Sequence, residues 1–263
     1  MSTEKSIAIV VRVVDFSETS KVVTLFTRNF GKITGLAKGA YRRNGPFDSA
    51  LDLLSIVRVV FIHKTHEAMD LLTESKLERR FKSASTDLDR LHCAFYLAEL
   101  LSALTGEADA NPQLYDAAES TLIKIDSTSE SPHFLLATFE CQMLEMVGHG
   151  PMLDICVGCG EAVAADHRQF FGTLAGGLYC STCRVGKKSV ITLSPNAWQL
   201  LDSLKANSPI GNQVAEIVEP FRAGPRIPAG LGEVREVLNH FVSHLLGSRP
   251  KLQNFLRVPS GNI

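Results

Sequence analysis

Four cysteines in the second half of the chain have the spacing of a metal site. They form two Cys-x-x-Cys pairs, Cys156 with Cys159 and Cys180 with Cys183, and 20 residues separate the pairs. Two residues between thiolates let one tight turn direct both sulfur atoms to the same point, and two such turns supply the tetrahedral sulfur ligands that Zn²⁺ accepts. The pattern therefore predicts one structural zinc ion.

Four cysteine ligands would close the site, whereas a catalytic zinc keeps one position for water. A redox dithiol and an iron–sulfur cluster are the chemically competent alternatives for the same two pairs. His167 lies between the pairs and could replace a cysteine, but an exposed loop histidine is the simpler expectation. Cys93 and Cys141 fall on the apolar sides of predicted helices, so we expect them to be buried as small hydrophobic residues.

The bulk composition is that of an ordinary globular protein. The 263 residues are 45% hydrophobic and 21% charged, which is enough apolar content to bury a core. No stretch approaches the roughly 20 apolar residues of a membrane helix, and the first residues lack the basic flank and apolar run of a signal peptide. We expect a cytoplasmic protein, in which cysteines bind metal or are buried instead of forming disulfides.

The net charge of −1 hides an asymmetry along the chain. Residues 1–80 carry 13 Lys and Arg against 9 Asp and Glu, whereas the remainder carries 14 against 19. The segment from Arg12 to Arg43 contains seven basic residues and two acidic ones. This density of positive charge favours a phosphate-facing surface. The candidate DNA-binding residues are Arg12, Lys21, Lys32, Lys38, Tyr41, Arg42 and Arg43.

The elements that must position these residues change in kind along the chain. Short β-branched runs separated by turn signals predict five strands, at 7–14, 22–27, 32–37, 51–62 and 68–77, and hence a small barrel. From Thr86 the apolar period changes to that of a helix, with Leu88, Leu91, Phe95, Ala98 and Leu101 on the predicted buried face. Further helices are predicted to begin near 111, 131, 194 and 231.

Catalytic motifs are missing from the sequence. It has no Gly-x-x-x-x-Gly-Lys loop, no Gly-x-Ser-x-Gly elbow and no His-Glu-x-x-His helix. Asp87 and Asp89 are the nearest approach to a magnesium-binding pair, but we expect them in the polar first turn of a helix, facing different ways. The sequence predicts a binding protein and not an enzyme.

Several stretches in order resemble the RecO family of DNA repair and recombination mediators. At the start these are 8–12, 18–27, 31–33 and 37–40; the helical region contributes 96–100 and 148–151; the zinc module contributes 176–180 and the end contributes 245–256. The chain departs from the family pattern in the short basic turn after Gly39. It departs again at Gln253, where a small hydroxyl residue is usual.

The resemblance implies an α+β architecture with four parts. These are an amino-terminal five-stranded oligonucleotide-binding (OB) barrel at 1–80, an α-helical domain at 81–151 and 191–250, an inserted four-cysteine zinc module at 152–190, and a tail at 251–263. It also implies binding of single- and double-stranded DNA, annealing of complementary strands, and loading of RecA onto DNA coated by single-stranded DNA-binding protein. The implied partners are RecR, the tail of single-stranded DNA-binding protein, and RecF.

The implied function leaves residue roles to be assigned. Tyr41 is the preferred base-stacking residue, and Phe16 and Phe30 are expected in the barrel core. Arg249, Lys251 and Arg257 are candidates for binding an acidic protein tail. The alternatives to a DNA-binding mediator are a protein-docking adaptor and a zinc-ribbon transcription factor.

Overall fold

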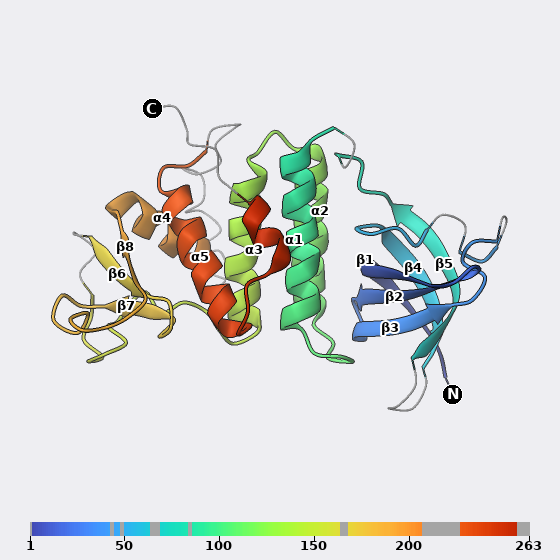
Figure 1. The fold of residues 1–263 in the computed structure, drawn as a ribbon, viewed down its shortest axis with the longest axis horizontal. Helices are drawn as coiled ribbons and strands as arrows, with labels where there is room; N and C mark the ends of the chain where they lie inside the picture. The colour runs from blue at the N-terminus through green and yellow to red at the C-terminus, as the bar shows by residue number, and fades with distance from the viewer. Residues whose placement is uncertain are drawn as a thin grey trace. The chain divides into compact units, whose positions relative to one another are not determined.

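The computed structural model describes residues 2–42, 45–47, 50–63, 69–83, 86–163, 168–206 and 227–256. The chain divides into two compact units, Met1–Ser127 and Thr128–Ile263. Figure 1 labels the helices and strands of both units. Among the described helices, none has the length and apolar content needed to cross a bilayer.

The first unit begins with a closed five-stranded barrel whose strand order is β1-β2-β3-β5-β4 (Figure 1). All neighbouring strands are antiparallel except β3 and β5, which pair in parallel and close the barrel. This is the five-stranded barrel of the OB fold, as predicted. The strands are β1 (Thr3–Ser17), β2 (Ser20–Thr27), β3 (Gly31–Ala37), β4 (Ile56–Ile62) and β5 (Asp70–Arg79).

The boundaries of all five strands differ from the prediction by one residue or more, and those of β1 and β4 differ most. β1 begins at Thr3 and runs to Ser17, because its early residues continue to pair with β4. The strand predicted from residue 51 begins only at Ile56. Leu54 has a φ of 66°, outside the extended region, and the Ser55 amide bonds the Asp52 carbonyl at 3.1 Å, so these residues form a turn instead.

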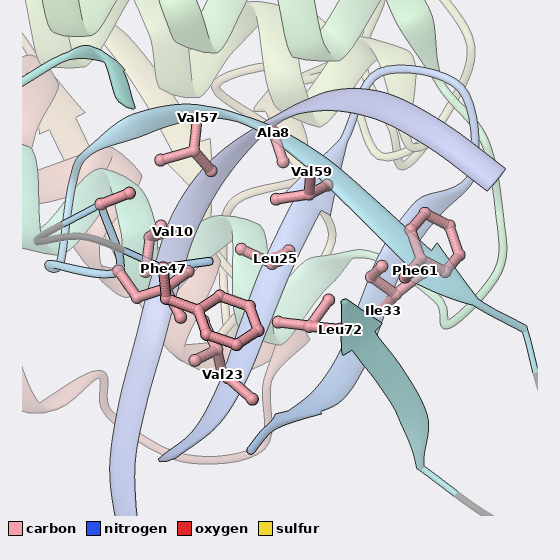
Figure 2. Close-up of a cluster of buried hydrophobic side chains, with 13 residues drawn as sticks. Ala8, Val10, Val23, Leu25, Ile33, Phe47, Val57, Val59, Phe61 and Leu72 are labelled. Atoms are coloured by element: carbon pink, nitrogen blue, oxygen red, sulfur yellow. The ribbon is translucent and has the colours of Figure 1, made fainter. Parts of the chain in front are cut away.

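The barrel core is made by alternate residues of each strand. Val23 and Leu25 on β2 point inward with Leu72 from β5, and Figure 2 shows these side chains in one cluster. Phe47 and Leu51 from the β3–β4 connection join the same cluster. Because the period of a strand is two, the residues between them face outward, which leaves the outer face of β1 and β2 to be covered by other elements.

Helices α1 (Leu88–Leu104) and α2 (Pro112–Ser127) complete the first unit. Asp87 caps α1 by accepting a bond from the Arg90 amide at 3.1 Å, which is the structural role expected for this carboxylate. The predicted buried face of α1 is partly wrong, since Leu88 is 68% exposed while Cys93, Tyr96 and Leu97 are buried. The helix packs on both β1 and α2, so its buried surface is wider than one apolar stripe.

The outer face of the barrel is joined to these helices by a ring stack and an ion pair. The ring of Phe26 stacks on that of Tyr115 with centroids 6.3 Å apart. Arg28 makes two bonds to the Asp116 carboxylate, at 2.7 and 2.9 Å. The barrel and α1–α2 therefore share one packed interface within the first unit.

The second unit combines helices with a small sheet. Its strands pair in the order β7-β6-β8, all antiparallel. Glu140 of α3 and Arg235 of α5 form an ion pair whose side chains are 0% and 2% exposed. The elements are α3 (Pro132–Met146), β6 (Gln169–Gly172), β7 (Gly177–Tyr179), β8 (Val190–Leu193), α4 (Pro195–Ala206), α5 (Leu231–Leu245) and the 3₁₀ helix η4 (Lys251–Phe255).

Candidate metal centre and nucleic-acid interface

The four cysteines of the two Cys-x-x-Cys pairs meet in the structure. The Sγ atoms of Cys156, Cys159, Cys180 and Cys183 all lie within 4.8 Å of one another, and those of Cys159 and Cys180 are 3.9 Å apart. A tetrahedron with metal–sulfur bonds of about 2.3 Å has sulfur–sulfur edges of about 3.8 Å. The arrangement fits a four-thiolate metal site, and these four residues could hold a metal ion.

Glycine allows the two cysteine turns to approach. A Cβ atom on Gly158 would lie 2.9 Å from the Cβ and 3.1 Å from the Sγ of Cys183. Gly160 ends the first turn with a φ of 79°, and its amide donates to the Cys156 carbonyl at 2.8 Å. A side chain at either position would therefore strain the first turn or push the second cysteine pair away.

Backbone amides prepare two of the sulfur atoms for ionisation. Burial opposes ionisation of Cys156, but the amides of Cys180 and Gly158, at 3.2 and 3.3 Å from its Sγ, outweigh it and lower its pKa to about 6. The Cys183 amide likewise lowers the pKa of Cys180. Hydrogen bonding to the Cys180 and Cys159 sulfurs raises the pKa of Cys183 to about 12. Four thiolates together therefore require a cation among them.

The other cysteines follow the prediction. Cys93 and Cys141 are both fully buried, and burial raises the pKa of Cys141 to about 12. Both behave as small core residues. His167, the possible substitute ligand, lies outside the described residues.

On the barrel, three side chains gather at the end of the β1–β2 hairpin. Tyr41 is 49% exposed and its hydroxyl donates to the Asp15 carboxylate, which raises the pKa of Tyr41 and keeps it protonated. The Lys21 ammonium lies over the same ring, 4.7 Å from its centroid. Asp15 and Lys21 are direct cross-strand partners. The predicted residues Lys21 and Tyr41 are thus brought together.

The strand register places Arg12 on a different face. Arg12 pairs with Thr24, whereas the next pair, Val13 with Val23, carries the core-facing Val23. Because faces alternate along a strand, Arg12 lies on the outer face of β1 and Lys21 on the core-facing side.

The remaining predicted cations follow β3. Lys38 and Arg42 are exposed in the turn that follows this strand. The Arg42 amide donates to the Gly39 carbonyl at 3.0 Å. The Arg42 side chain also folds back over Gly39, where a Cβ would lie 3.2 Å from its Cδ. Arg43 lies outside the described residues.

Lys32 is placed differently from the other predicted cations. Its ammonium donates to the Ser102 and Thr105 carbonyls at the end of α1, both at 2.7 Å. These carbonyls belong to the negative end of the helix dipole, where a cation is stabilising. Lys32 therefore acts as a helix cap inside the first unit, and we leave it out of the DNA-facing set.

The two phenylalanines expected in the core differ. Phe30 packs against the core, with its ring edge-on to Phe61 at 5.3 Å between centroids. The prediction for Phe16 is wrong, since it is 60% exposed. It lies at a register shift in β1 between Asp15 and Ser17, where the inward–outward alternation is broken. Its position at the strand end, before the Glu18–Thr19 turn, is the sequence signal that could have indicated exposure.

The candidate protein-binding residues lie at the end of the second unit. The Nε of Arg249 donates to the Gln253 side-chain oxygen at 2.8 Å, and the Gln253 amide nitrogen donates to the Asn239 carbonyl at 2.7 Å. Gln253 is buried and joins η4 to α5. Lys251 is exposed on η4, and Arg257 lies outside the described residues.

A cavity of about 610 Å³ lies beside these residues. Arg249 and Gln253 line it together with Arg235, Glu236, His240 and Leu256. Apart from the one glutamate, the lining combines cationic, polar and apolar groups, which can bind an anionic group attached to an apolar one.

Comparison with known proteins covers nearly the whole chain. Residues 1–81 match the family model described as Recombination protein O N terminal, and residues 85–253 match Recombination protein O C terminal. The chain is 38% identical to DNA repair protein RecO of Rhodopirellula baltica, over 95% of this chain and 97% of the relative. It is 31% identical to the protein of the same name in Anaeromyxobacter dehalogenans, over 97% and 96%, and 32% identical to that of Myxococcus xanthus, over 95% of each.

Proposed function

The chain belongs to the RecO family, and from that premise we propose that it is a DNA repair protein that binds single- and double-stranded DNA and anneals complementary strands. We further propose that it helps to load RecA onto DNA coated by single-stranded DNA-binding protein. The observation that carries the proposal is the group of cations and aromatic rings on the closed barrel, centred on the exposed Tyr41 ring and the half-buried Lys21 over it.

This surface has both parts that strand binding needs. Lys38 and Arg42 are exposed cations for phosphates, and Tyr41 and Phe16 are exposed rings for bases. Arg12 offers a further exposed cation on the outer face of β1. Stacking tolerates any base sequence because every base has a π-face. Cations that bind two strands also screen their repulsion, so annealing in this mechanism requires neither nucleotide hydrolysis nor catalysis.

The test is strand annealing on DNA coated with single-stranded DNA-binding protein, without ATP. Replacing Lys38 and Arg42 by alanine should slow annealing and make the salt dependence of log K for single strands shallower by about 1.4, since each lost phosphate contact removes about 0.7. The control is Arg58→Ala, which removes a barrel arginine that is paired with Glu78 at 3.1 Å. Unchanged affinity and salt dependence in the double variant would reject the proposed surface.

We propose that the metal at the four cysteines is zinc, bound as a structural ion. A closed sulfur set leaves no ligand position for water, so the ion would stabilise the surrounding turns without activating a nucleophile. Metal analysis of the purified protein should give one zinc per chain. Iron with the visible absorption of a cluster would favour the iron–sulfur alternative.

A protein-docking role is supported by the cavity at η4. We propose that the acidic tail of single-stranded DNA-binding protein binds there, with Arg249 and Lys251 as the cations, and that RecR and RecF are further partners. Leu256 and Arg249 line the same cavity, as a tail with apolar and carboxylate groups would need. A tail peptide should bind the wild type and bind Arg249→Ala more weakly. Equal binding would exclude this site.

A further inference from the structure

The sheet of the second unit has one face packed on helices and one face turned away from them. Phe171 and Leu178 pair across β6 and β7 and are fully buried, and the Phe171 ring meets that of Phe241 at 5.9 Å. Phe170 and Tyr179 form the next cross-strand pair, so their side chains lie together on the opposite face. Both are only half-buried.

Each of these two aromatic rings has a cation over it. The Cζ of Arg184 lies 4.0 Å from the centroid of Phe170, and the Nζ of Lys187 lies 5.6 Å from that of Tyr179. Both cations come from the exposed segment that follows the second cysteine pair and also contains Lys188. The turn that binds the metal therefore also positions these cations on the sheet.

The segment that contains these residues carries charge of one sign. Residues 168–193 contain four Lys and Arg and no Asp or Glu, although the chain after residue 80 has a net charge of −5. Gly172 makes room for one of the rings, because a Cβ there would lie 2.4 Å from Cε2 of Tyr179. The Tyr179 ring thus lies close against the β6 backbone.

We propose that this face, formed by Phe170, Tyr179, Arg184, Lys187 and Lys188, binds a single nucleic-acid strand. Aromatic rings on an antiparallel sheet and arginine guanidinium planes are surfaces on which unpaired bases stack, and the lysines supply phosphate contacts. An acidic protein segment would use the charges but has no need of two adjacent rings. A nucleic-acid strand uses both.

The inference builds on the proposed DNA-binding function but assigns it a second surface. The barrel surface belongs to the first unit and this sheet face to the second. A protein with one strand-binding surface on each unit can hold both complementary strands at once, which is what annealing requires. Binding to two surfaces also raises overall affinity without any new contact between the units.

The experiment compares full-length, metal-loaded wild type with a Lys187→Ala/Lys188→Ala double variant and with Arg184→Ala. The control is Lys205→Ala, whose ammonium lies on α4 and pairs with Asp154 at 3.0 Å. Metal content and Trp198 fluorescence verify folding of each variant. The readouts are annealing rate, salt dependence of single-strand affinity, and photocrosslinking of a bromodeoxyuridine-containing oligonucleotide followed by peptide mapping.

We expect crosslinks at Phe170 or Tyr179, annealing about tenfold slower in the double variant, and a salt dependence shallower by about 1.4. Normal annealing with crosslinks only in residues 1–127 would overturn the inference and leave the barrel proposal standing. Crosslinks in 168–193 without any in the barrel would support the inference while rejecting the barrel surface. If the double variant loses binding of a polyglutamate probe but binds DNA normally, the face serves an acidic partner and the inference is wrong.

Discussion

The two β-structures of this chain differ in how we expect them to be stabilised. The barrel closes on itself around a cluster of 13 buried hydrophobic residues. The β7-β6-β8 sheet has strands of three or four residues, packs one face on helices, and lies beside four cysteines that could hold a metal ion. A structure that buries enough apolar surface needs no metal, whereas we expect one this small to need a cross-link such as a bound ion.

Metal removal should give the largest difference in stability between the two regions. Structural zinc contributes about 10–16 kcal/mol to the folding of small metal-binding domains, so Cys180→Ser or a strong chelator should unfold the cysteine turns. We expect new protease cleavage around residues 152–190 and altered fluorescence of Trp198, the single tryptophan. Cleavage resistance of residues 2–42 should not change. Simultaneous loss of both regions would contradict the comparison.

The buried ion pair tests whether the helices of the second unit depend on charge. Arg235→Leu leaves the Glu140 carboxylate buried without its partner cation, so the free energy of unfolding of this unit should fall by about 3–5 kcal/mol. The double variant Glu140→Leu/Arg235→Leu should recover most of the loss. Urea unfolding followed at Trp198 measures both. A double variant as unstable as the single one would show that the two side chains stabilise this unit by more than neutralising each other's charge.

The barrel should lose stability when a buried side chain is shortened. Leu25 is fully buried in the core cluster, and Leu25→Ala should lower the free energy of unfolding of the first unit by about 2–5 kcal/mol. Val14, which is 43% exposed on the same hairpin, is the matched control. Val14→Ala should change the free energy of unfolding of the first unit by less than about 0.5 kcal/mol. Circular dichroism during urea unfolding measures the loss, while Trp198 should report an unchanged second unit.

The smallest effect is electrostatic. The Arg28 guanidinium lowers the pKa of Asp116 below 3.8. A carboxylate with a lowered pKa stabilises the fold above its unfolded pKa, and this contribution disappears as the pH falls below 3.8. The melting temperature of the wild type should therefore fall slightly more on acidification than that of Asp116→Asn. If the curves of melting temperature against pH ran parallel for the two proteins, the exposed pair would contribute nothing measurable to stability.

The sequence predicted features that depend on local pattern. Strand alternation indicated the five barrel strands, and the Cys-x-x-Cys spacing indicated which sulfurs meet. Both patterns repeat over a few residues, so neighbours in sequence constrain each other directly. The resemblance to a known family supplied the OB architecture, which the barrel and the family match confirm.

Features that depend on distant partners were not predictable in the same way. Lys32 looks like any other basic residue in its segment, and only the approach of the α1 terminus makes it a helix cap. The usual burial of aromatic residues predicts Phe16 in the core, but the register shift in β1 leaves it exposed. The charge of the 168–193 segment was hidden in the acidic average of the remaining chain.

The packed interface between the barrel and α1–α2 limits where the chain can be cut into fragments that fold. The amino-terminal family model ends at residue 81, but a fragment cut there would lose the Tyr115 ring that covers Phe26 and the carbonyls that receive Lys32. Residues 1–127 form one compact unit, so we expect a fragment of this length to fold, with helices and barrel gaining hydrogen-exchange protection together. A border of sequence similarity is therefore not a border of cooperative folding.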